Sequence, residues 1–125
     1  MQLAGSKFID LQFPGRHRLV AGDSQLTLPK FMASHAHLGR FVDCFFVDGG
    51  HSEKCCWSDL GAAAVITRPK GVIICDEVVA DSCSSSSMKS WEIGPTRAWR
   101  RARREGIVDE LGIKNRMAWG RPKTD

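Results

Sequence analysis

The sequence predicts an α/β domain in which helices pack against a parallel sheet. Two segments, residues 41–47 and 72–75, are almost continuously apolar, as strands are when both of their faces are buried. Between them, residues 52–66 carry apolar side chains at helical spacing. Strand, helix and strand in this order indicate a parallel pair joined by a crossover helix.

The segment before the first apolar run predicts two helices and a short strand. Residues 2–13 have a weak helical pattern, which a Pro-Gly pair ends. Residues 17–21 fit a short strand. Thr27 then fits the N-cap of a helix whose first turn holds a proline, with Phe31 and Met32 facing inward.

The helix predicted over 52–66 begins at Ser52, whose hydroxyl can accept a backbone N–H at the helix N-terminus. The apolar stripe of this helix is expected to consist of Trp57, Leu60, Ala64 and Val65. A Pro-Lys-Gly sequence at 69–71 predicts a turn before the second buried strand.

The C-terminal part predicts a loop, a helix and a last strand. Residues 81–93 are rich in serine and are expected to form a mobile loop. The Gly-Pro-Thr sequence at 94–96 should open a helix that runs to about Glu105, with Trp99 facing the core. Residues 117–120 fit the final strand.

The composition is that of one globular domain spanning residues 1–125, with 42% apolar residues, 26% charged residues and a net charge of +4. The N-terminus lacks the pattern of a signal peptide, and no apolar run reaches the ~18–20 residues of a membrane span. Five cysteines, an odd number, favour reduced thiols over a disulfide framework. We therefore expect a cytoplasmic protein that has no membrane partner.

Polar residues follow three of the predicted strands: Asp23-Ser24, Asp48 to His51, and Asp76-Glu77. Ligands of α/β sheets bind at the carboxyl ends of the strands. If the strands before Asp48 and Asp76 are neighbours ~4.8 Å apart, their carboxylates share one small site. Like charges so close repel, and a divalent cation with oxygen ligands, Mg²⁺ or Ca²⁺, would neutralise them.

Asp48 and His51 are separated by two glycines, which let the backbone turn sharply or approach a ligand closely. The imidazole would lie at the N-terminus of the next helix, where the helix dipole favours a neutral base. Two other interpretations remain at this point. The acids could simply cap the following elements beside a surface histidine, or His51, Cys55 and Cys56 could bind zinc, although adjacent cysteines point in different directions on a helix.

These residues resemble the class I S-adenosylmethionine-dependent methyltransferases, and among them the family 24 methyltransferase-like domains. The resemblance rests on residues 46–52 (Phe-Val-Asp-Gly-Gly-His-Ser), on Asp59-Leu60, and on residues 71–77 (Gly-Val-Ile-Ile-Cys-Asp-Glu). It extends over roughly residues 10–120. No GxGxxG, Walker or GxSxG motif occurs in this sequence.

The resemblance implies roles for particular residues. Asp48 and Asp76 match the metal-binding acids of cation-dependent O-methyltransferases, and Glu77 falls where those relatives carry Asp or Asn. His51 matches the histidine that deprotonates the acceptor hydroxyl. Asp23 and Ser24 fall on the adenine side of the cofactor, and Asp48 is also a candidate contact to S-adenosylmethionine. The implied activity is O-methyl transfer to a small-molecule hydroxyl with help from a divalent cation.

One part of the family pattern is missing. The family's sheet has the strand order 3-2-1-4-5-7-6, and its first two strands, with the glycine-rich cofactor loop, have no counterpart here. We therefore expect a partial Rossmann-like methyltransferase sheet with helices on both faces, corresponding to the C-terminal two-thirds of the domain. Such a fragment should bind the cofactor weakly or not at all, and should be inactive as it stands.

The alternative function is that of a non-catalytic basic module. The arginines that would form one cationic face of a helix are Arg97, Arg100, Arg101 and Arg104. Such a face would contact nucleic acid or phosphorylated ligands. No aromatic residues interleave with these arginines, so a solvated outer helix is the plainer interpretation and nucleic acid is not an expected partner.

Overall fold

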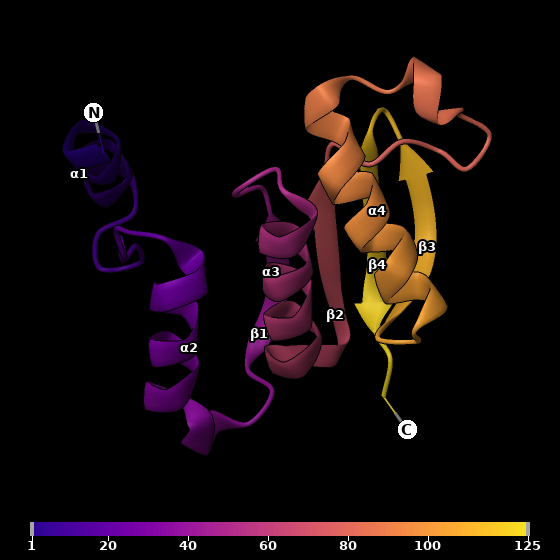
Figure 1. Ribbon diagram of the computed structural model, residues 1–125. Coiled ribbons are helices and arrows are strands. Elements are labelled where there is room, and N and C mark those ends of the chain that lie inside the picture. Colours follow the sequence, from indigo (N-terminus) through magenta and orange to yellow (C-terminus); the bar gives the residue numbers. More distant parts are fainter. Residues whose placement is uncertain (1, 125) are drawn as a thin grey trace.

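The computed structural model describes residues 2–124 and contains a mixed four-stranded sheet with the order β1-β2-β4-β3 (Figure 1). The strands are β1 (Val42–Val47), β2 (Thr67–Asp76), β3 (Val108–Lys114) and β4 (Met117–Pro122). β1 and β2 are parallel, whereas β4 runs antiparallel to both β2 and β3. This order equals the last four positions, 4-5-7-6, of the sheet that the sequence resemblance implied, so the predicted α/β fold is confirmed.

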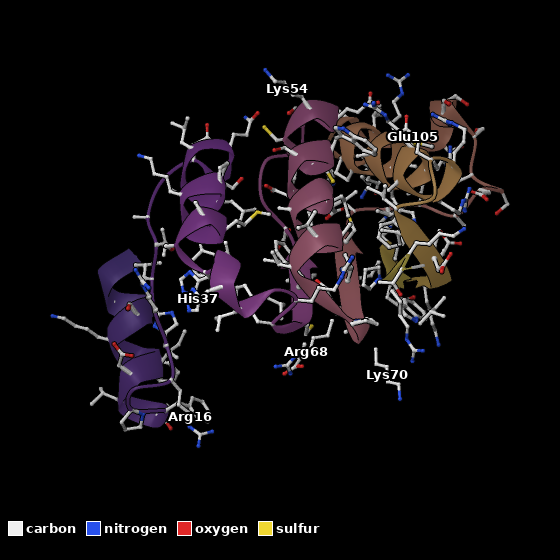
Figure 2. The ribbon with its side chains drawn as sticks, turned by 90° about the horizontal axis from the view of Figure 1, so that it is seen from below. Arg16, His37, Lys54, Arg68, Lys70 and Glu105 are labelled. Carbon is white, nitrogen blue, oxygen red and sulfur yellow. The ribbon has the colours of Figure 1, made fainter. Side chains whose placement is uncertain are left out.

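The helices are α1 (Gln2–Gln12), α2 (Ser24–Ser34), α3 (Glu53–Ile66) and α4 (Ser90–Arg104), with short 3-10 turns at Ala36–Leu38 and Ser85–Ser87. α3 and α4 pack side by side across one face of the sheet, and α2 packs against α3 (Figure 1). α1 stands apart from the sheet, as the view from below also shows (Figure 2). Within residues 2–124, no helix combines the length and the apolar character that a membrane crossing requires.

The core lies between the sheet and the pair α3 and α4. Leu60 of α3, Ile73 of β2 and Trp99 of α4 are fully buried there. The Trp99 indole N–H donates a hydrogen bond of 2.6 Å to Glu110 Oε2, so the buried ring has its polar partner. Burial of these large side chains supplies most of the driving force that holds the two helices on the sheet.

The short strand predicted at 17–21 is not present. The segment is extended but pairs with no other strand among the described residues, and Leu19 and Val20 are 44% and 47% exposed. A strand needs a neighbour to satisfy its backbone N–H and C=O groups, and these residues have none. α2 also begins earlier than predicted, at Ser24, because the Asp23 side chain caps it by accepting the Gln25 N–H at 2.9 Å.

β1 is not buried on both faces, which corrects the prediction for residues 41–47. Val47 is buried and Phe45 packs against the core, but Cys44 and Phe46 on the opposite face are exposed. The reason is the position of β1 at the edge of the sheet, with helices over only one of its faces. An apolar run therefore identified the strand correctly but overestimated how much of it is covered.

Two details of the α3–β2 connection also differ from the sequence prediction. The turn expected at 69–71 is part of β2, which starts at Thr67 and whose pairing with β1 shifts register between Val42 and Cys44. Val65 is 58% exposed, because the buried stripe of α3 consists instead of Cys56, Asp59, Leu60, Ala63 and Ile66. Leu60 is buried as predicted and Trp57 packs against the core, so the predicted stripe is wrong at Val65.

The sequence analysis found β4 but missed β3. The two strands form an antiparallel hairpin whose two linking residues, Asn115 and Arg116, have φ angles of 53° and 60°. Two successive positive φ angles belong to the type I′ turn, which matches the twist of a hairpin. Asn115 is a residue typical of this turn, but the Asn-Gly pair that usually identifies it is replaced by Asn115-Arg116.

α4 begins at Ser90, before the Gly-Pro-Thr sequence that was predicted to open it. Glu92 makes the earlier start stable, because its Oε2 accepts the Lys89 N–H at 3.0 Å. Glu92 is almost fully buried and pairs with Arg116 of the hairpin turn at 2.5 Å. Gly94 thus lies inside α4, where a Cβ would collide with the His51 carbonyl oxygen.

Replacing Gly94 with alanine should lower the free energy of unfolding by about 1–3 kcal/mol, since the added methyl group forces α4 away from the backbone that precedes α3. Urea unfolding followed by circular dichroism measures the effect. The matched control is Gly61→Ala in α3, where nothing lies within 4 Å of the new Cβ. This control should gain about 0.5–1 kcal/mol from helix propensity. Equal effects of the two changes would contradict the packing of α4 against the α3 N-terminus.

Glu77, which follows β2, has a φ angle of 59°, a left-handed conformation that asparagine adopts more readily than glutamate. Glu77→Asn should therefore raise the free energy of unfolding by roughly 0.5–1 kcal/mol. Glu77→Val should lower it, because a β-branched side chain is strained there. Chemical unfolding of the two variants tests both signs, and a loss of stability in Glu77→Asn would argue against a strained residue at this position.

Candidate functional site

The carboxyl ends of β1 and β2 meet at one edge of the sheet. Val47 and Cys75 are direct partners in the parallel ladder, so the next residues, Asp48 and Asp76, leave the sheet side by side. Two acids 28 positions apart in the sequence are thus brought together by strand pairing alone. Asp48 is exposed and Asp76 is half-buried, so both carboxyl groups remain accessible from solvent.

The Asp48 carboxyl group has a pKa above its ordinary value. Partial burial is the largest cause, followed by repulsion from Asp76 and a hydrogen bond between the two side chains. The charge of His51 acts in the opposite direction. The two acids therefore form an interacting pair in which ionising both carboxyl groups is unfavourable unless a positive charge lies nearby.

His51 lies on the turn between β1 and α3, directly before the helix. Ser52 is the N-cap of α3, as predicted, and its hydroxyl accepts the Cys55 N–H at 3.1 Å. The His51 side chain is exposed, and its main chain packs under Gly94 of α4. This packing holds the turn in place, so the imidazole is presented from a fixed backbone beside Asp48.

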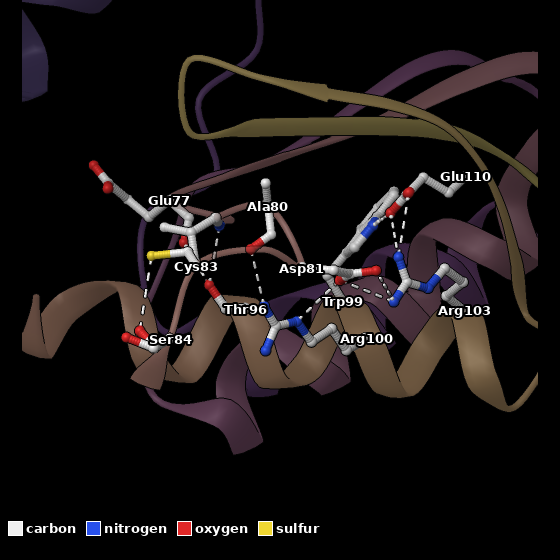
Figure 3. Close-up of polar contacts among 11 residues, drawn as sticks. Glu77, Ala80, Asp81, Cys83, Ser84, Thr96, Trp99, Arg100, Arg103 and Glu110 are labelled. Atoms are coloured by element: carbon white, nitrogen blue, oxygen red, sulfur yellow. Dashed lines mark hydrogen bonds and ion pairs between the residues drawn. The ribbon is translucent and has the colours of Figure 1, made fainter. Parts of the chain in front are cut away.

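Glu77 does not join the two aspartates in a group of three ligands. Within residues 2–124, no three side chains of His, Cys, Asp or Glu gather where they could share a metal ion. The Glu77 carbonyl oxygen accepts a hydrogen bond from the Thr96 hydroxyl at 3.3 Å, and its carboxylate points away from α4 (Figure 3). Glu77 thus joins the end of β2 to α4 through its backbone.

The zinc interpretation of His51, Cys55 and Cys56 gains no support from the geometry. The Cys55 sulfur accepts a hydrogen bond from Gln25 of α2 at 3.1 Å, whereas Cys56 is buried with its sulfur 3.6 Å from that of Cys75. The two neighbouring sulfurs therefore face different elements. A hydrogen bond with Cys56, and then burial, raise the pKa of the Cys75 thiol, which keeps Cys75 protonated and unreactive.

Asp23 and Ser24 lie at the N-terminus of α2, beside the same edge of the sheet. Asp23 caps the helix, and Ser24 is its first residue. A cavity of about 340 Å³ separates α2 from β1. The residues that line it come from α2, β1, the turn after β1 and α3: Ser24, Thr27, Leu28, Phe45, Phe46, Val47, Asp48, Gly49 and Asp59.

Asp59 is the functional candidate that the sequence analysis did not assign. It is 5% exposed, its Oδ1 atom has no hydrogen-bond partner, and burial raises its pKa, while a hydrogen bond from Ser24 lowers it. A Cβ at Gly49 would lie 3.2 Å from Asp59 Oδ2, so the carboxyl group sits directly under the turn after β1. The sequence signal was an acid on an apolar helical stripe, between Cys56 and Leu60.

The loop between β2 and α4 is fastened to α4 by several polar contacts (Figure 3). Arg100 donates to the Ala80 carbonyl oxygen at 3.2 Å, and Arg103 pairs with both Asp81 and Glu110. Arg101 pairs with Glu105 and lies over the Trp57 ring, 3.9 Å from its centroid. Two of the four arginines proposed for a cationic surface thus pair with acids, Arg100 with Asp81 and Arg101 with Glu105, which reduces the charge available to a polyanion.

Comparisons with known proteins identify the family and the fold. A family model described as "Methyltransferase domain", Methyltransf_24, matches residues 3–78. A search of curated proteins finds no match.

Two solved structures share the fold. One is the apo structure of CalS11, a TDP-rhamnose 3′-O-methyltransferase in calicheamicin biosynthesis, at 18% identity and a TM-score of 0.57 over 82% of this chain. The other is SAH-bound PaMTH1, a methyltransferase of Podospora anserina, at 15% identity and a TM-score of 0.60 over 98% of this chain. The chain spans 41% and 56% of the lengths of these two proteins.

The family match covers more than half of the sequence and ends just after the Asp76-Glu77 pair, so it includes both acids at the carboxyl ends of β1 and β2. The strand order and the structural neighbours agree with it. The chain therefore belongs to the family 24 methyltransferase domains, which are class I methyltransferases.

Proposed function

We propose that this chain forms part of an S-adenosylmethionine-dependent O-methyltransferase that acts on a hydroxyl group of a small molecule. The observation that supports this most directly is the meeting of Asp48, Asp76 and His51 at the carboxyl ends of two parallel strands. Two acids on one edge provide a place for a divalent cation that would stabilise an alkoxide, and the imidazole provides a group to accept the proton of the hydroxyl.

The residues around the cavity fit a nucleoside-bearing cofactor. Its walls combine apolar side chains, such as Leu28 and Phe45, with the polar groups of Ser24, Asp48 and Asp59. A mostly apolar pocket with a few fixed polar groups is typical of sites for small organic ligands. When bound, S-adenosylmethionine would supply the methyl group on its sulfonium. Asp23, Ser24 and Asp48 are the residues proposed to hold its adenosine part.

The acid pair is the proposed site of a divalent cation. Asp48 and Asp76 repel each other when both are ionised, and a hard cation would relieve this repulsion. Mg²⁺ commonly uses only one or two protein carboxylates and keeps water in its other positions, so a third protein ligand is not required. Asp48 and Asp76 would hold the cation, which would lower the pKa of an acceptor hydroxyl.

His51 is the proposed general base. It is exposed at the turn after β1, next to Asp48, where it can reach a hydroxyl bound at the same edge. Accepting the hydroxyl proton would leave an oxygen nucleophile to attack the methyl group. The rigid turn beneath His51 matters because methyl transfer depends on alignment of the attacking oxygen.

The first test uses two-dimensional ¹⁵N NMR to monitor the binding of S-adenosylhomocysteine to the chain. We expect shifts of the amide signals of Ser24 and Gly49, which line the cavity. The dissociation constant should be weaker than about 100 μM (about −5.5 kcal/mol), because the sequence contains no glycine-rich cofactor loop. Adenosine monophosphate at the same concentration controls for general nucleotide binding. A dissociation constant below about 100 μM would contradict the weak binding expected of this fragment, and shifts confined to residues distant from the cavity would overturn the proposal.

Magnesium should stabilise the wild-type chain at pH 7 through the acid pair. At a Mg²⁺ concentration roughly ten times the dissociation constant, the gain is about 1.4 kcal/mol. The gain should disappear in Asp48→Asn and Asp76→Asn and persist in Asp109→Asn, whose carboxyl group is exposed on β3. It should also vanish near pH 3, below the pKa of an unfolded aspartate (about 3.9), because the carboxyls then hold protons.

Without magnesium, we expect Asp76→Asn to stabilise the folded protein. The pKa of Asp48 is higher in the folded chain than in the unfolded chain, so ionisation of this carboxyl group lowers the stability of the fold. This loss of stability is absent below the pKa of the unfolded chain. It grows as the pH rises toward the pKa of the folded chain. Removing Asp76 relieves part of that cost and should stabilise the protein by a few tenths of a kcal/mol at pH 7. Magnesium stabilisation that survives both substitutions would exclude the acid pair as the cation site.

A further inference from the structure

A second cavity, of about 200 Å³, lies between α2 and the extended segment 17–21. The residues that line it are Arg18, Val20, Thr27, Lys30, Phe31 and Ser34. The four residues from α2 follow the spacing i, i+3, i+4 and i+7, so they share one face of the helix, and the two from the segment lie on one side of an extended chain. Gly22, with a φ angle of 127°, makes the turn that lets the segment lie along α2.

The charge of this cavity is positive, because the described residues that line it include two cations and no acid. Arg18 and Lys30 come from different elements, and within residues 2–124 neither forms an ion pair. The acids nearest to them in the sequence have other partners: Asp10 lies 3.7 Å from His17, and Asp23 caps α2. Two like charges beside one small cavity repel each other, and an anion between them would be stabilised by both.

The donors that this cavity offers to an anion are those of its two cations. The Thr27 and Ser34 hydroxyls each donate to a main-chain carbonyl oxygen, at 3.1 Å and 2.9 Å, so their protons are already used. The guanidinium of Arg18 presents a planar pair of N–H groups, and the ammonium of Lys30 acts as a point charge. A phosphate group has three terminal oxygens and close to two negative charges, so it can engage both cations at once.

The size and the apolar wall of the cavity restrict the ligand further. Pockets for drug-sized molecules have volumes of about 300–1,000 Å³, so this smaller cavity suits a phosphate group and the few atoms next to it. Phe31 and Val20 form an apolar wall, and the Phe31 ring is held by stacking on His35 with 4.2 Å between the ring centroids. A nucleic-acid strand is bound by a row of cations along its backbone. A single pair of cations beside an apolar wall fits a small organic phosphate better.

We propose that the cavity between segment 17–21 and α2 binds the phosphate group of a small phosphate monoester. Arg18 and Lys30 hold the phosphate oxygens, and the organic part lies against Phe31. This site is separate from the proposed methyl-transfer site at the carboxyl ends of β1 and β2, and it does not rest on that function.

The test is a titration of the ¹⁵N-labelled chain with phenyl phosphate, monitored by two-dimensional NMR. We expect shifts of the amide signals of Val20, Lys30 and Ser34, whereas those of Ser24 and Gly49, in the cavity next to β1, should not move. Phenol at the same concentration should cause no shift, because it has no charge. Inorganic phosphate should bind roughly three- to tenfold more weakly than phenyl phosphate, since it lacks the apolar contact.

Substitution of the two cations tests their role directly. Arg18→Gln and Lys30→Gln should each weaken the binding of phenyl phosphate by roughly three- to tenfold. Both side chains are exposed, so thermal unfolding of the variants should match that of the wild-type chain. The matched control is Arg16→Gln, which removes an exposed arginine two positions away that does not line the cavity, and it should bind as the wild-type chain does.

Several results would overturn the proposal. Equal weakening in Arg16→Gln would show a general attraction of anions to this part of the chain. Equal affinities for inorganic phosphate and phenyl phosphate would exclude an organic ester as the preferred ligand. Tighter binding of a single-stranded oligothymidylate would identify nucleic acid as the ligand. The absence of any shift with phenyl phosphate would exclude the site and leave the methyltransferase proposal, which S-adenosylhomocysteine tests, unaffected.

Discussion

The parallel pairing of β1 with β2 is the interaction on which the rest of the site depends. It sets Val47 opposite Cys75, and the residues that follow, Asp48 and Asp76, therefore emerge at the same height from neighbouring strands. A shift of the register by one residue would turn each side chain to the other face of the sheet. The buried contacts of Val47 and Cys75 with the helices hold this register, so core packing and site geometry have one cause.

A second constraint is the close contact between α4 and the backbone that leads into α3. Gly94 has no side chain, which allows α4 to lie directly on the main chain of His51. The same helix holds the loop after β2 through Thr96, Arg100 and Arg103. α4 thus fixes the loops that follow both strands of the site, although it contributes no proposed catalytic residue.

The edge strands β1 and β3 each have an outer edge without a strand partner among the described residues, whereas the strands between them are paired on both sides. Between β2 and β4, every strand edge is paired and the covering helices are well packed. At β1, the outer edge has no strand partner among the described residues, and Phe46 is about half exposed. The cavity with Asp59 lies on this less covered side. The residues proposed to contact ligands therefore lie on the side of the sheet where side chains have fewer partners within the chain.

The sequence by itself determined the α/β class, the strands at β1, β2 and β4, the Ser52 cap and the two acids at the strand ends. These features rest on local signals: apolar runs, helical spacing and capping chemistry. Only the tertiary structure decided that 17–21 is unpaired and that one face of β1 is open, because burial depends on which elements lie alongside. It also decided that Asp59 is buried beside the cavity next to α2, since the position of an acid on an apolar stripe becomes informative only when the helix face and its neighbours are known.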